Sequence, residues 1–225
     1  MVLEMEEELI RMLWFIGAIV MFIIAYLLFA IRKENKHVKY ILKPGTMIMI
    51  ILLAITGSGL DSVFSIYVVM ALLFSLAGDI FLMWDDRWFI HGLASFLGAH
   101  IIYIAGFLTS FSLDFQSSVT VTSGVILGVI ALAFFMVLVL FVHKQGGTRL
   151  TVAVFSYILV ITWMVWTSVI TEDRLLMIAA LLFYVSDAVL AYDRFKKTFS
   201  SAEYIVMATY FPAQLLFRIR VITIG

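Results

Sequence analysis

The stretch VFSIYVVMALLFSLAGDIFLMW, residues 63–84, decides the fold class, because it is an apolar run whose only charged residue is Asp79. About 20 consecutive apolar residues are enough for a helix to cross a bilayer. A carboxylate inside such a helix costs roughly 2.5 to 3.5 kcal/mol on the insertion scale. A similar phrase, SDAVLAYDRF from Ser186, places Asp187 near the end of another apolar segment. Two carboxylates at such a cost indicate that function requires them.

The composition indicates that hydrocarbon is the main solvent of the chain. Of the 225 residues, 64% are hydrophobic and 13% are charged, whereas soluble domains carry about 25% charged residues. The 15 basic and 15 acidic residues balance, so the sequence predicts no nucleic acid partner. The absence of cysteine excludes disulfides and thiol catalysis.

Eight apolar runs are long enough to span a membrane, and short segments join them. They fall near residues 9–31, 40–57, 63–84, 89–111, 119–142, 150–170, 173–192 and 203–222. Runs of this length without alternation form helices, since only helices and closed barrels satisfy their backbone groups in lipid. The sequence therefore predicts an all-α, polytopic protein in which residues 1–225 form one integral membrane domain.

Basic residues gather in every second loop, and this asymmetry predicts the orientation in the membrane. These loops hold Arg32, Lys33, Lys36, Lys39, Arg87, Lys144, Arg149, Arg194, Lys196 and Lys197, with Lys43 at their margin. The opposite side holds Arg11, Arg174, Arg218 and Arg220. We expect the first set to face the cytoplasm and both termini to face away from it, in the cytoplasmic membrane if the protein is bacterial.

This topology places Asp79 and Asp187 at similar depth, each in the last turns of a helix that runs toward the cytoplasm. Asp187 follows Asp79 by 108 positions, and the same alignment pairs Leu82 with Leu190. A parallel repeat of four helices plus four fits this match.

Further polar residues lie inside the apolar runs and must face the bundle interior or a watery cavity, since lipid cannot satisfy them. They are Lys43, Ser75, His100, Tyr103, Tyr184, Ser186, Tyr210, Gln214 and Arg218. Ser75 lies four residues before Asp79, and Tyr184 three before Asp187, so each pair shares a helix face.

Structural roles compete with functional ones for these residues. The two serines can bond a carbonyl of the preceding turn. His100, Tyr210 and Gln214 can join helices by hydrogen bonds, and the basic residues can extend to the headgroups. The sequence predicts no metal and no cofactor, because no two histidines share a helix face at ligand spacing.

Five phrases together resemble the YhhN-like lysoplasmalogenase family in order and spacing. They are KPGTM (43–47), FSLAGDIFLM (74–83), FLGAHIIY (96–103), YVSDAVLAYDRF (184–195) and YFPAQLLFR (210–218). The resemblance covers nearly the whole chain. It implies an eight-helix membrane hydrolase that cleaves the vinyl ether bond of lysoplasmalogens, releasing a fatty aldehyde and glycerophosphoethanolamine or glycerophosphocholine.

Roles for the polar residues follow from this resemblance and from the chemistry of vinyl ethers. Hydrolysis needs an acid that protonates carbon and an anion that stabilises the resulting cation and activates water, as paired carboxylates do in glycosidases. We expect Asp79 and Asp187 to be that pair and Lys43 to bind the substrate phosphate. Seven residues would orient the carboxylates or the water: Ser75, His100, Tyr103, Tyr184, Ser186, Tyr210 and Gln214. The substrate would be a lysophospholipid taken from the membrane.

Two other classes of function fit the same carboxylates. One is a small membrane transporter coupled to protons or other ions. The other is a zinc-dependent intramembrane lipid amidase, which Ser75 and Asp79 faintly suggest. Flux into liposomes without product formation would favour the first, and metal in the purified protein would favour the second.

Overall fold

The computed structural model describes residues 2–31, 36–58 and 60–222, and within them the chain forms helices without any strand. The elements are α1 (Val2–Ala25), the π-helical turn η1 (Tyr26–Ile31), α2 (Lys36–Ser58), α3 (Val63–Met83), the 3₁₀ turn η2 (Asp86–Trp88), α4 (Phe89–Ser110), α5 (Ser118–Ile170), α6 (Arg174–Phe195) and α7 (Ala202–Ile222). The predicted all-α class is confirmed.

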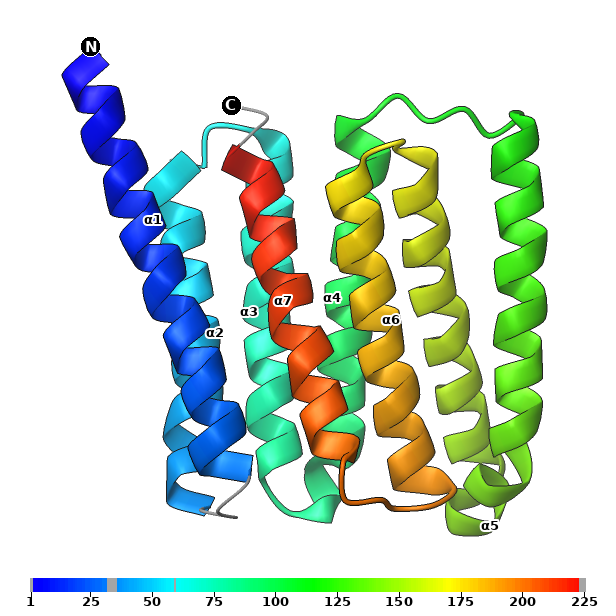
Figure 1. Ribbon diagram of the computed structural model, residues 1–225. Coiled ribbons are helices and arrows are strands. Elements are labelled where there is room, and N and C mark those ends of the chain that lie inside the picture. The colour runs from blue at the N-terminus through cyan, green and yellow to red at the C-terminus, as the bar shows by residue number, and fades with distance from the viewer. Residues whose placement is uncertain (1, 32–35, 59, 223–225) are drawn as a thin grey trace.

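The long element α5 contains two helices that run in opposite directions (Figure 1). The chain turns at Gly147, which has φ 61° and ψ −158°, a backbone conformation that favours glycine over residues with a side chain. The two limbs of α5 correspond to the predicted spans 119–142 and 150–170. Seven α elements therefore take the place of the eight separate helices that the sequence predicts.

Six helices in the described part of the chain are long and apolar enough to cross a membrane, and α5 counts once among them. The predicted eighth span, 203–222, forms α7 but does not belong to this set. Its buried polar residues Tyr210, Gln214 and Arg218 lower its hydropathy, while α7 packs against α2, α3 and α6. Neighbouring helices, rather than lipid, surround its polar stripe.

The directions of the helices bring both aspartates to one end of the bundle. The helices α3 and α6 run toward the end opposite the two termini, and α2 and α7 begin there (Figure 1). The orientation of this end in the membrane stays a prediction. Arg32 and Lys33, which contributed to it, lie outside the described residues.

Side-chain caps fix the other ends of α3 and α6. The hydroxyl of Ser62 accepts a hydrogen bond from the backbone N–H of Ser65 at 3.0 Å, and the carboxylate of Asp173 accepts one from Leu175 at 2.9 Å. Such caps satisfy backbone donors that a helix leaves open in its first turn.

Candidate functional site

A polar chamber of about 560 Å³ lies at the end of the bundle where α3 and α6 finish and α2 and α7 begin. Its wall carries seven charged side chains, namely Lys39, Lys43, Asp79, Asp85, Asp187, Asp193 and Glu203. Aromatic and apolar residues complete it: Tyr26, Tyr40, Leu82, Met83, Trp84, Phe96, Leu190, Ala202, Val206, Met207 and Tyr210, together with Ser186. The volume is in the range of about 300–1,000 Å³ that is typical of small-molecule sites.

Asp79 forms an ion pair with Lys43 inside this wall. The Nζ atom of Lys43 lies 2.9 Å from Oδ1 of Asp79, and the two side chains are 8% and 1% exposed. The hydroxyl of Tyr210 donates to the other carboxylate oxygen at 2.7 Å. Residues of α2, α3 and α7 thus meet at one carboxylate, which is satisfied on both oxygens.

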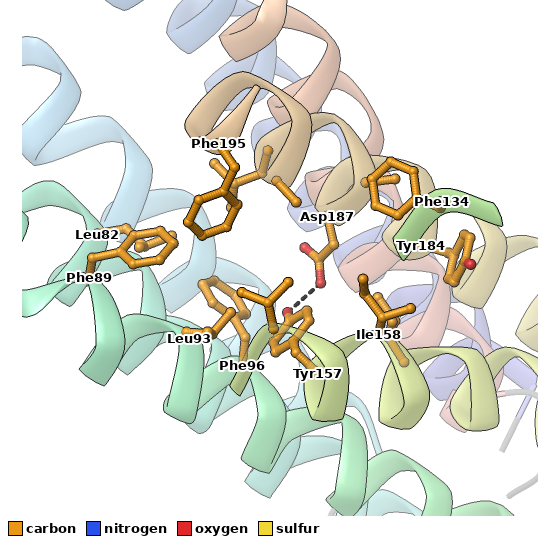
Figure 2. A pocket seen from close by; sticks show the side chains of 15 residues that line it. Leu82, Phe89, Leu93, Phe96, Phe134, Tyr157, Ile158, Tyr184, Asp187 and Phe195 are labelled. Atoms are coloured by element: carbon orange, nitrogen blue, oxygen red, sulfur yellow. Dashed lines mark hydrogen bonds between the residues drawn. The ribbon is translucent and has the colours of Figure 1, made fainter. Parts of the chain in front are cut away.

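Asp187 has a different set of partners, from α4 and α5. The hydroxyl of Tyr157 donates a short hydrogen bond to Oδ2 of Asp187, as Figure 2 shows. The Nε2 atom of His100 lies 3.1 Å from the same oxygen and 3.0 Å from the Tyr157 hydroxyl. All three side chains are buried, and Asp187 among them also borders the chamber.

A narrow apolar slot of about 40 Å³ lies on the other side of Asp187, between α4, α5 and α6 (Figure 2). Its wall consists of Leu82, Phe89, Leu93, Phe96, Phe134, Val154, Tyr157, Ile158, Ile161, Tyr184, Asp187, Ala188, Leu190, Ala191 and Phe195. Asp187 is the one charged residue that the described part of the chain places in this wall.

Four residues border both cavities: Leu82, Phe96, Asp187 and Leu190. Asp187 alone among them is polar. Its carboxyl group therefore lies where a charged, water-accessible space meets a hydrocarbon-like one. A molecule with a polar head and an apolar tail could place the bond between its two parts beside this group.

The remaining predicted residues form no hydrogen bond with either carboxylate in the described part of the chain. Tyr103 donates its hydroxyl to the amide oxygen of Gln214 at 2.7 Å, which joins α4 to α7. Ser186 donates to the carbonyl of Val206 at 3.2 Å. The hydroxyls of Ser75 and Tyr184 are buried and have no hydrogen-bond partner there. His100 and Tyr210 do contact the aspartates, and the orienting roles of all seven residues stay predictions.

Sequence reasoning missed Tyr157, and it missed the acidic and basic residues at the mouth of the chamber. Tyr157 lies in the apolar run 150–170, and the residues three and four positions away on either side are all apolar, namely Ala153, Val154, Val160 and Ile161. Nothing in its spacing marks it. The signal that could have found it is its hydroxyl, which must find a partner when buried.

Among the described residues, no group of three or more His, Cys, Asp or Glu side chains is arranged to hold a metal ion.

Comparisons with known proteins find relatives over most of the chain. The YhhN family matches residues 38–220, a range that includes every residue lining the chamber and the slot except Tyr26. No solved structure gives a significant match.

The curated relatives carry one functional name. Lysoplasmalogenase TMEM86B of Mus musculus is 33% identical over 147 residues, which are 65% of this chain and 59% of that protein. The Homo sapiens protein of the same name is 34% identical over 146 residues, 65% of this chain and 59% of that protein. The Sus scrofa protein is 32% identical over 151 residues, 67% and 61% of the two chains. The chain thus spans about three fifths of the length of the curated relatives it matches.

Proposed function

This chain belongs to the YhhN family, and we propose that it is a membrane hydrolase that cleaves the vinyl ether bond of lysoplasmalogens. The relatives named lysoplasmalogenase support this substrate class. The products would be a fatty aldehyde and the glycerophospho-headgroup.

The position of Asp187 is the observation that carries the proposal. In a lysoplasmalogen, the vinyl ether oxygen joins the polar glycerol to the apolar alkenyl chain. With the headgroup in the chamber and the first carbons of the chain at the slot, this bond would lie beside the residue that borders both cavities. Its neighbours Leu82, Phe96 and Leu190 would hold the reacting segment in place.

In the first step, the carboxylic acid of Asp187 would protonate the vinyl carbon that is not bonded to oxygen. The other vinyl carbon then shares its positive charge with the ether oxygen as an oxocarbenium ion. His100 and Tyr157, which contact Asp187, would hold the carboxyl group in position and return a proton to it. A positioned general acid contributes about 10²- to 10⁴-fold to a rate.

In the second step, water from the chamber would add to the cationic carbon, and a carboxylate would accept its proton. Asp79 is suited to this role, because Lys43 pairs with its carboxylate and Tyr210 orients it. The hemiacetal then breaks its carbon–oxygen bond to glycerol, and the glycerol oxygen gains a proton. One water is consumed, and no electrons are exchanged with any other molecule.

The direct test is incubation of the purified protein in detergent with a 1-alkenyl lysophospholipid, with the aldehyde measured by mass spectrometry. The matched control lipid carries a saturated ether in place of the vinyl ether. We expect aldehyde from the vinyl ether alone. Without aldehyde from either lipid, the proposed reaction is wrong.

A further inference from the structure

The mouth of the chamber carries an ion pair that the proposed reaction does not use. The Nζ atom of Lys39, at the start of α2, lies 2.5 Å from Oε2 of Glu203, at the start of α7. The hydroxyl of Tyr26 donates to the other carboxylate oxygen of Glu203 at 2.9 Å. All three residues line the chamber.

The exposure of these side chains suits contact with a ligand from water. The side chains of Lys39 and Glu203 are 26% and 38% exposed, whereas those of Lys43 and Asp79 are 8% and 1% exposed. A phosphate that bound Lys43 would compete with the carboxylate of Asp79 for the same ammonium group. Lys39 can turn toward a phosphate at a smaller cost in desolvation.

The arrangement of charge around the chamber favours one kind of headgroup. Of the seven charged residues that the described part of the chain contributes to its wall, five are acidic and two are basic. A headgroup with net negative charge meets this excess unfavourably. A zwitterion instead places a cation next to its phosphate, and the pair Lys39 and Glu203 presents the complementary charges side by side.

We infer that Lys39 and Glu203 form the headgroup subsite, in which Lys39 binds the phosphate and Glu203 binds the ammonium group of a zwitterionic lysophospholipid. The inference rests on the proposed function for its substrate class. The headgroup would contact Lys39 and Glu203 rather than the buried ion pair of Lys43 and Asp79. Tyr26 acts as a positioning residue that orients Glu203.

Binding of lipids that the enzyme cannot cleave tests this subsite independently of the reaction. The two probes are a saturated 1-O-hexadecyl lysophosphocholine and the matching 1-O-hexadecyl glycerol 3-phosphate, which lacks the ammonium group. Calorimetric titration of the full chain in detergent gives each Kd, and tryptophan fluorescence, to which Trp84 in the chamber wall contributes among five tryptophans, gives a second signal. We expect the choline lipid to bind the more tightly by about tenfold, since its trimethylammonium group, which has no N–H to donate, would still be attracted by the negative charge of Glu203.

Three variants separate recognition from structure. Glu203→Gln should weaken the binding of the choline lipid by about tenfold and leave the binding of the phosphate lipid unchanged or tighter. Lys39→Gln should weaken the binding of both lipids. The double variant Lys39→Glu with Glu203→Lys keeps an ion pair between α2 and α7, so it should unfold at the wild-type temperature and still lose the choline lipid. Glu172→Gln and Lys197→Gln, on exposed residues outside the chamber, are the matched controls.

The subsite is wrong if Glu203→Gln weakens both lipids equally, or if the double variant binds the choline lipid like the wild type. These outcomes differ from a failure of the proposed reaction. Headgroup-dependent binding without aldehyde release would overturn the reaction and leave the subsite. Aldehyde release together with lipid binding that Glu203→Gln does not change would overturn the subsite and leave the reaction.

Discussion

Lys43 and Asp79 form an ion pair of 2.9 Å between α2 and α3 with almost no exposure to solvent. Loss of one partner of a buried pair leaves the other charge without a counterion, which costs about 3–5 kcal/mol, whereas replacement of both is often neutral. A single substitution at this pair therefore changes stability together with chemistry, and a double substitution separates the two effects.

We predict that Asp79→Asn lowers the thermal stability in detergent and abolishes aldehyde release. The double variant Lys43→Met with Asp79→Asn should regain most of the stability, because the unpaired ammonium group is gone and Tyr210 can still donate to the amide oxygen. It should stay inactive. Unfolding temperature and aldehyde yield are the two measurements, and turnover in either variant near that of the wild type would contradict a role for the carboxylate.

Asp187→Asn should reduce turnover by about 10²- to 10⁴-fold, the usual contribution of a general acid. Its fold should persist, because the amide keeps the size of the side chain and an acceptor for Tyr157. Asp61→Asn, on an exposed residue, is the control that should keep full turnover. Retained activity of the Asp187 variant in single-turnover measurements would remove this residue from the mechanism.

Tyr157→Phe should lower kcat by about tenfold or more with little change in KM. The substitution removes a hydrogen bond to Asp187, and bonds to charged groups contribute about 1.5–3 kcal/mol. The shape of the slot wall hardly changes. Tyr67→Phe, on a residue that lines neither cavity, should behave like the wild type. A change in KM alone would instead indicate that Tyr157 serves only to shape the slot.

Gly78→Ala should destabilise the bundle and lower activity, because a Cβ atom there would lie 2.6 Å from the ring of Phe96. Phe96 borders both cavities, so its displacement changes their shape, and overpacking typically costs about 1–3 kcal/mol. Gly128→Ala is the matched control, since nothing lies within 4 Å of its added Cβ. It should be neutral or stabilising by about 0.5–1 kcal/mol. Equal unfolding temperatures for the two variants would contradict this account.

Depth along the membrane normal could be predicted from the sequence, because it depends on the lengths of apolar runs and on the alternation of helix direction. Asp79 and Asp187 accordingly border one chamber in the structure. The limits of α3 and α6 also agree with the predicted spans 63–84 and 173–192 within a few residues.

Rotation of each helix about its own axis could not be predicted in the same way, because it depends on packing between helices far apart in sequence. The ion pair of Lys43 with Asp79 was not predicted, and the phosphate role of Lys43 stays a prediction. The spacing of residues around Tyr157 gave no signal, since one tyrosine in an apolar run looks like many others. The predicted spans 119–142 and 150–170 form one element, α5, because the chain reverses tightly at Gly147 without a longer loop.

The common border of the two cavities has a consequence for what happens after bond cleavage. Scission beside Asp187 would release an oily fragment on one side and a salt-like fragment on the other. The aldehyde would partition into lipid and the glycerophospho-headgroup into water. The reverse reaction would require both products to leave these phases and return to the site. The bilayer itself would then drive turnover forward.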